Sequence, residues 1–151
     1  MKKFRFTLDK LLDYKGQLLE KEKNDLAALN LRRAETQEEI ELLESELHRA
    51  QDSFNEKAAR GIAATDMMVF ANYQKGLRIK IEDARKELCE IEKEVERQTG
   101  VVVEASKEVS SLEKLEEKQL EEYKFRAAKA EESFIEEYVN GNAVRSAMAQ
   151  N

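Results

Sequence analysis

The stretch ARGIAATDMMVFANY, residues 59–73, differs from the rest of the chain and decides its fold. On both sides run tracts such as QEEIELLESELHRAQ and KELCEIEKEVERQ, which are dense in Glu, Lys, Leu and Arg. Within the stretch the charge density falls, and a glycine precedes small residues, two methionines and two aromatic residues. Gly61 suits the residue just past a helix end, and Thr65 with Asp66 suits a helix start. The stretch therefore predicts a tight bend between two helices, over about 61–65.

The composition favours long helices over a compact globule. Of the 151 residues, 38% are charged, none is proline or tryptophan, and five are glycine. A globule needs many turns, and turns need Gly, Pro or Asn. Abundant Glu, Lys, Leu and Ala at regular spacing is instead typical of coiled coils. Disorder is disfavoured because the aliphatic residues are regularly spaced and both signs of charge are mixed.

Two apolar seams follow the chain, one on each side of the bend. Thr7 can cap a first helix over about 7–60, in which a seven-residue series runs from Leu12 to Phe54. A second helix over about 66–140 carries a seam from Phe70 to Leu112, which continues after an eleven-residue step at Tyr123. Such narrow seams need a partner helix, and an antiparallel hairpin hides both.

The predicted fold is therefore all-α, a single two-helix antiparallel coiled-coil hairpin over 1–151 whose second helix is longer than the first. Asn140 or Gly141 can close the second helix, which leaves a frayed tail over about 141–151. Phe4 and Phe6 can still cover Leu120 and Tyr123. No part of the first helix remains to cover 127–139, and an exposed apolar stripe usually marks a partner surface.

The six phenylalanines and four tyrosines fall at the two ends of the predicted hairpin. They either close the helix ends or form docking surfaces, since aromatic residues concentrate binding energy at interfaces. At the end with the termini the candidates are Phe4, Phe6, Tyr123, Phe125, Phe134, Ile135 and Tyr138. At the bend they are Met67, Met68, Phe70, Tyr73 and Leu77.

Catalytic, metal and cofactor chemistry is not expected. His48 stands alone, whereas a metal site needs several ligands, and Cys89 is expected to be a half-buried inert thiol with no histidine to activate it. General acid catalysis by a glutamate needs a pocket rather than a solvated helix face, and no phosphate-binding glycine loop is present. We expect no enzyme, no cofactor and no metal.

Charge and hydropathy narrow the class of partner. The net charge is −6 with a pI near 5.1, whereas nucleic-acid binders display a basic face, so no nucleic acid is expected. No apolar run fits a signal peptide or a membrane span, so no direct membrane insertion is expected. A single cysteine cannot form an internal disulfide, which favours a cytoplasmic location.

Three segments together resemble the flagellar export protein family FliJ. They are FRFTLDKLLDYKGQLLEKEK (4–23), GIAATDMMVFANYQKGLRIKIE (61–82) and SLEKLEEKQLEEYKFRAAKAEESFIEEYV (111–139). The features that carry the resemblance are an aromatic-x-aromatic pair before the first helix, a G-I-x-x bend and an L-E-K-L-x-E tail. The segment IEEYVNGN departs from the more charged tails of the family.

The resemblance implies a long antiparallel coiled coil similar to the central stalk of rotary ATP synthases. It implies a part of the flagellar type III export apparatus that is peripherally associated with the inner membrane. The implied partners are the export ATPase hexamer, which the end with the termini would enter, and the cytoplasmic part of the export gate, which the bend would face. Tyr73 and Leu77 match expected gate contacts, and export chaperones are a further implied partner through their recycling.

Other functions remain open from the residues alone. A stalk of a virulence-type secretion system has the same structure. A generic coiled-coil scaffold would be a dimer or larger, whereas the hairpin is expected to be a monomer when alone. A coiled-coil arm of a nucleic-acid enzyme predicts a basic face, and a cargo chaperone predicts binding of export substrates without the ATPase.

Overall fold

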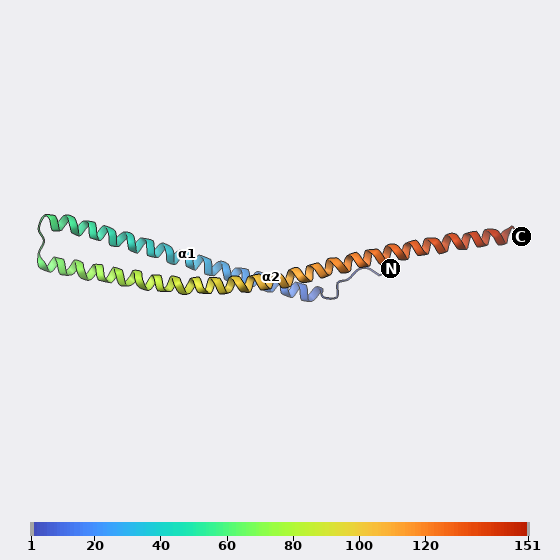
Figure 1. Cartoon of the computed structure of the whole chain (residues 1–151), viewed down its shortest axis with the longest axis horizontal. Helices are drawn as coiled ribbons and strands as arrows, with labels where there is room; N and C mark the ends of the chain where they lie inside the picture. The colour runs from blue at the N-terminus through green and yellow to red at the C-terminus, as the bar shows by residue number, and fades with distance from the viewer. Residues whose placement is uncertain (1, 151) are drawn as a thin grey trace. The chain divides into compact units, whose positions relative to one another are not determined.

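The computed structural model describes residues 2–150 and is built from two helices (Figure 1). α1 spans Asp9–Ala59, 51 residues, and α2 spans Ala64–Ala149, 86 residues. The described residues contain no strand. The all-α hairpin with a longer second helix is therefore confirmed.

The bend forms where the sequence predicts it. Gly61 has a φ of 91° and is the one described residue with a φ in the left-handed region. Its amide donates to the carbonyl of Ala58 at 3.2 Å, and the amide of Arg60 donates to Lys57 at 3.1 Å. These bonds satisfy carbonyls that the end of α1 leaves free, so the glycine both ends α1 and turns the chain.

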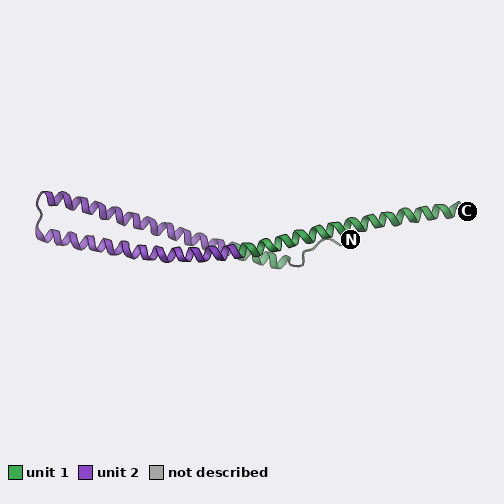
Figure 2. Ribbon diagram, viewed as in Figure 1, with its two compact units in different colours: residues 1–19, 105–151 green, residues 20–104 purple. Residues whose placement is uncertain are grey.

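Contacts cluster in two units, one over 20–104 and one over 1–19 with 105–151 (Figure 2). In the first unit α1 and α2 leave the bend side by side and run antiparallel (Figure 1). Its interior follows the two predicted seams, and Ile91, at 1% exposure, is its most deeply buried large side chain. The buried apolar residues of this unit are Ile40, Leu77, Ile81, Ala84 and Ile91.

Two polar side chains are buried in the same seam. Thr36 donates its hydroxyl to the carbonyl of Arg32 at 2.9 Å, one turn back in its own helix. Gln98 donates its amide across the interface to the backbone carbonyl of Glu22 at 3.1 Å and to the carboxylate of the same residue at 2.5 Å. Because a polar contact in an apolar seam satisfies its groups in one alignment only, it favours one register of the two helices.

The second unit joins the N-terminal residues to the later part of α2. Residues 2–6 form no helix, and the carbonyl of Lys2 accepts a hydrogen bond from the hydroxyl of Tyr123 in α2. Phe6 is buried, and the ring of Phe4 lies 5.5 Å from the ring of Tyr123. The Nζ atom of Lys15 in α1 lies 2.8 Å from the carboxylate of Glu108. The expectation that Phe4 and Phe6 lie over the Tyr123 region agrees with these contacts.

The helix ends differ from the prediction in three places. α1 begins at Asp9 because residues 7–8 form a turn, in which the Asp9 amide donates to the Phe6 carbonyl. α2 begins at Ala64, two residues early, since the Met67 amide already reaches the Ala63 carbonyl.

α2 also continues through the predicted closure at Asn140 or Gly141 to Ala149. Gly141 keeps a helical conformation there, and the alanines that follow are strong helix formers. Asn151 of the predicted frayed tail lies outside the described residues.

Candidate docking surfaces

The last part of α2 carries apolar side chains that nothing in its unit covers. Every residue over 131–140 is exposed, and Figure 2 shows no second helix beside this part of α2. Phe134 is 68% exposed and Tyr138 is 63% exposed. Ile135 and Val139 are also exposed. Large apolar side chains grouped in this way are uncommon on a free surface.

This group continues the face that is covered earlier in the same helix. Steps of three and four residues lead from Tyr123 through Ala127 and Ala130 to Phe134 and Tyr138. Tyr123 and Ala127 are half-buried, and exposure rises from Ala130 onward. We call the exposed residues Phe134, Ile135, Tyr138 and Val139 the α2 stripe. It is a seam without a partner helix.

The predicted residues at this end divide into two groups. Phe4, Phe6 and Tyr123 pack together within the unit. Phe134, Ile135 and Tyr138 belong to the α2 stripe. Phe125 is 65% exposed but lies two positions from both Tyr123 and Ala127, so it projects from the opposite face of the helix. The Nζ of Lys129 lies 5.7 Å from its ring centroid, a weak cation–π contact.

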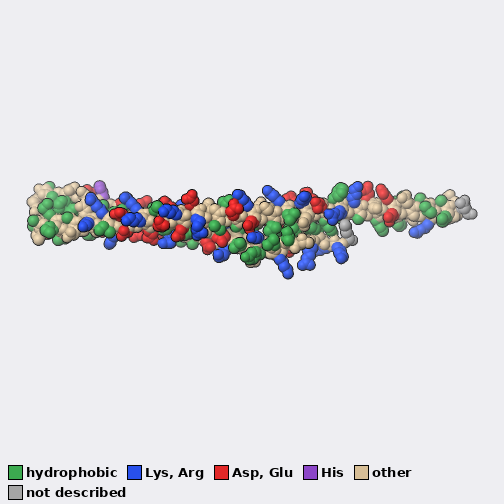
Figure 3. Space-filling view, turned by 60° about the horizontal axis from the view of Figure 1, so that its bottom comes forward, with side chains coloured by type: hydrophobic (Ala, Val, Ile, Leu, Met, Phe, Trp, Pro, Cys, Tyr) green, Lys and Arg blue, Asp and Glu red, His purple; other side chains and the backbone are tan. Residues whose placement is uncertain are grey.

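A groove of about 1020 Å³ lies at the bend, between the end of α1 and the start of α2. Its floor is apolar: the rings of Phe54 and Phe70 are stacked 4.1 Å apart, and Ile62 and Val69 lie beside them. Its charged lining consists of three basic side chains, Arg49, Lys57 and Arg60, and two acidic ones, Glu46 and Asp66. Figure 3 shows hydrophobic side chains gathered at this end.

Two side-chain hydrogen bonds connect α2 to α1 beside the groove. Tyr73 donates its hydroxyl to the carboxylate of Glu46, and Gln74 donates to Gln51 at 2.9 Å. The hydrogen bond to Glu46, with partial desolvation and the negative charge of the same carboxylate, raises the pKa of Tyr73 above its ordinary value, against a smaller opposing effect of Arg49. These bonds fix where Tyr73 stands at the groove.

Of the predicted bend residues, Phe70 and Tyr73 line the groove, and Met67, Met68 and Leu77 are not part of its lining. Met67, Met68 and Tyr73 are exposed, and Phe70 is half-buried on Phe54. Leu77 is only 4% exposed, because the seam of α2 has already met α1 at that position. The prediction did not assign the charged residues that line the groove, although Arg49, Lys57 and Arg60 all stand within the last turns before Gly61.

Comparison with known proteins identifies the family. The family model for the flagellar FliJ protein matches residues 4–147. The chain belongs to the FliJ family. Membership implies a component of the flagellar export apparatus, as the resemblance of the three segments predicts. No curated protein and no solved structure matches the chain.

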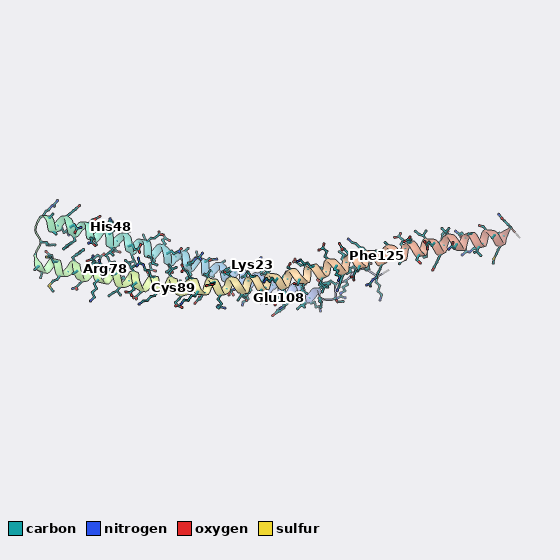
Figure 4. The ribbon with its side chains drawn as sticks, in the orientation of Figure 1. Lys23, His48, Arg78, Cys89, Glu108 and Phe125 are labelled. Atoms are coloured by element: carbon teal, nitrogen blue, oxygen red, sulfur yellow. The ribbon has the colours of Figure 1, made fainter. Side chains whose placement is uncertain are left out.

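The remaining reactive side chains of this FliJ family chain lie apart from both surfaces. His48 is exposed on α1, with its Nε2 3.4 Å from the carboxylate of Asp52 (Figure 4). Cys89 is free and exposed on α2, so the expected half-burial of its thiol is wrong: the position next to Leu88 already faces outward. No group of three potential metal ligands occurs within residues 2–150. Over the same residues, neither helix combines the length and hydropathy of a membrane span.

Proposed function

We propose that this chain is a non-enzymatic stalk of the flagellar export apparatus, which binds the export ATPase ring and links it to the export gate. The α2 stripe is the surface that enters the ring, and the bend is the surface that meets the gate. Family membership supports the setting, and the two surfaces described above supply a contact for each partner.

The observation that carries the proposal is the uncovered α2 stripe. A helix whose seam faces another helix over most of its length, and then faces nothing, leaves a surface suited to a second partner. Aromatic residues such as Phe134 and Tyr138 supply large contact areas at interfaces. A ring that surrounds the stripe would cover it as α1 covers the seam near Ile91.

The mechanism is binding without chemistry. A stalk can change the activity of a ring only if it contacts different subunit conformations with different affinity. Contacts through the α2 stripe would then favour the conformation that hydrolyses ATP, and the bend would carry that state to the gate. At the bend, Met67, Phe70 and Tyr73 are the proposed gate contacts. Leu77 joins them only if the seam opens locally. Recycling of export chaperones and peripheral attachment to the inner membrane through the apparatus belong to the same proposal.

The test is steady-state ATP hydrolysis by the cognate export ATPase with increasing amounts of this protein. We expect stimulation by the full chain and none by a chain truncated after Tyr123. The double variant Phe134→Ala with Tyr138→Ala should raise the half-maximal concentration by about a hundredfold or more, since each truncated interface aromatic can cost about 2 kcal/mol and about 1.4 kcal/mol is tenfold.

Leu42→Ala is the matched control, because Leu42 is 62% exposed on α1 and lies outside both docking surfaces. It should stimulate the ATPase like the wild type. If the full chain neither stimulates nor co-elutes with the ATPase, the stalk proposal fails. Sedimentation then decides between the alternatives, since a generic scaffold is a dimer or larger and this hairpin should be a monomer.

A further inference from the structure

A four-residue pattern occurs twice on α2. Leu120-Glu121-Glu122-Tyr123 and Ile135-Glu136-Glu137-Tyr138 each place an aliphatic residue and a tyrosine three positions apart, with two glutamates between them. Positions three apart lie on one side of a helix, and the face that holds Tyr123 is the face that continues to Tyr138. The helix therefore presents two similar surfaces in succession.

The first pattern has a visible occupant, the N-terminal segment 2–6. The hydroxyl of Tyr123 donates to the backbone carbonyl of Lys2 at 2.5 Å, and its ring lies 5.5 Å from the ring of Phe4. Phe6 is buried in the same unit. Because residues 2–6 form no helix, the occupant is a non-helical segment that offers backbone carbonyls to the tyrosine.

The occupant also has a defined side-chain chemistry. Lys2, Lys3 and Arg5 are exposed, whereas Phe4 and Phe6 are turned into contact. Tyr123, which contacts this segment, directly follows Glu121 and Glu122 in α2, and opposite charges attract over distances up to about 10 Å in ordinary salt. A segment that fits the pattern therefore alternates aromatic residues with lysine or arginine.

The second pattern offers the same groups and is uncovered. Ile135 and Tyr138 are exposed, and the segment 131–139 contains four glutamates and no lysine or arginine. We propose that this pattern binds a non-helical partner segment in which aromatic residues alternate with lysine or arginine, as residues 2–6 cover the first pattern. The identity of the partner as the export ATPase rests on the proposed function, whereas the chemistry of the segment rests on contacts within this chain.

The test uses a fluorescent peptide with the sequence of residues 2–7, KKFRFT, titrated with the full-length chain and followed by anisotropy. The chain's own N-terminal segment occupies the first pattern at high effective concentration, so the peptide reports on the second. We expect saturable binding that Tyr138→Ala weakens by about tenfold. Replacing both phenylalanines of the peptide by alanine should weaken it at least as much, and added salt should weaken it further.

Phe125→Ala is the matched control. Phe125 has nearly the same exposure as Phe134 but projects from the opposite face, so its variant should bind the peptide like the wild type. Tyr138→Phe removes only the hydroxyl and should lose part of the affinity. Circular dichroism checks that each variant keeps its helix.

Three results would overturn the proposal. The peptide could show no saturable binding, or its binding could be the same for Tyr138→Ala and the wild type. The chain could also self-associate in a way that deletion of residues 2–6 abolishes, in which case a second copy is the occupant.

Failure of the proposed function is a separate result: the peptide would bind the second pattern while the ATPase remains unstimulated. Stimulation that depends on Tyr138, without peptide binding, leaves the stalk proposal intact and rejects this one.

Discussion

Residues 77–98 and 131–149 belong to the same helix and both carry apolar side chains at helical spacing, yet only the first region is covered. Leu77, Ile81 and Ile91 are buried against α1, whereas no residue over 131–149 is buried. In proteins most helical stability comes from packing of an apolar face. The comparison teaches that an apolar face alone does not distinguish a core from a docking surface. What decides is whether the chain supplies a partner.

The largest expected effect is on the free energy of unfolding, where the same substitution of isoleucine by alanine should give different results in the two regions. Ile91→Ala removes the most deeply buried large side chain and should lower the free energy of unfolding by about 2–4 kcal/mol. Ile135→Ala removes an exposed side chain and should change it by less than about 0.5 kcal/mol. Urea unfolding followed by circular dichroism measures both.

Similar losses for the two variants would contradict the comparison, because they would mean that the stripe is already packed in the free protein. The ATPase assay should give the reverse ranking when the folded fraction is held constant. There, Ile135→Ala should weaken stimulation and a folded Ile91 variant should not.

The polar contact in the covered region has a smaller expected effect. Gln98→Ala removes the amide that donates to the carbonyl and the carboxylate of Glu22 in a part-buried site, and the loss of this charge-assisted hydrogen bond should cost about 1–3 kcal/mol. Gln98→Leu with Glu22→Leu removes both polar side chains and fills the seam, so it should restore much of the loss but relax the register.

Disulfide trapping measures that register. Two variants are made in a Cys89→Ser background, each with one cysteine in α1 and one in α2. In the first variant the α2 cysteine faces the α1 cysteine, and in the second it lies one helical turn away from that position. The wild-type contact should allow one pairing and the double leucine variant should allow both. A single pairing in both proteins would show that the aliphatic residues set the register without Gln98.

The sequence predicted what depends on periodicity and missed what depends on the facing helix. The seams and the bend follow from seven-residue spacing and from Gly61, and the exposed stripe follows from the unequal helix lengths. Gln98 was missed because a glutamine at a seam position resembles a surface residue until Glu22 is found opposite it. The charged lining of the groove was missed because it forms only where the end of α1 meets the start of α2.

Replacement of glycine by alanine should have opposite effects on stability at Gly61, in the bend, and at Gly141, in the uncovered region. Gly61 adopts a φ of 91°, so Gly61→Ala should destabilise the bend by about 1 kcal/mol, although space for the methyl group is free. Gly141 is helical in the uncovered region, so Gly141→Ala should stabilise the local helix by about 0.5–1 kcal/mol. Urea unfolding measures the first change, and hydrogen exchange of the amides around residue 141 measures the second.

Faster exchange in the Gly141 variant would revive the closure first predicted at that residue. Such a result would mean that the glycine leaves the helical conformation in solution and ends α2 there. An alanine at that position would then oppose the left-handed conformation, as it does at Gly61.

The smallest expected effect on stability concerns Tyr73, whose side chain forms a hydrogen bond from α2 to α1 near the bend. Because the neutral phenol of Tyr73 donates to Glu46, its pKa in the folded protein lies above the unfolded value near 10. A raised pKa means that the contribution to stability is present below pH 10 and is lost as the pH rises through the folded value.

An ultraviolet titration of the wild type minus that of Tyr73→Phe isolates this group. Glu46→Gln removes the negative charge and should move the transition to lower pH, whereas an unchanged transition would show that the two side chains are apart in solution. Since Tyr73 is exposed, the effect on unfolding should be small, and the comparison with the buried Ile91 then shows that apolar coverage rather than surface bonding stabilises the hairpin.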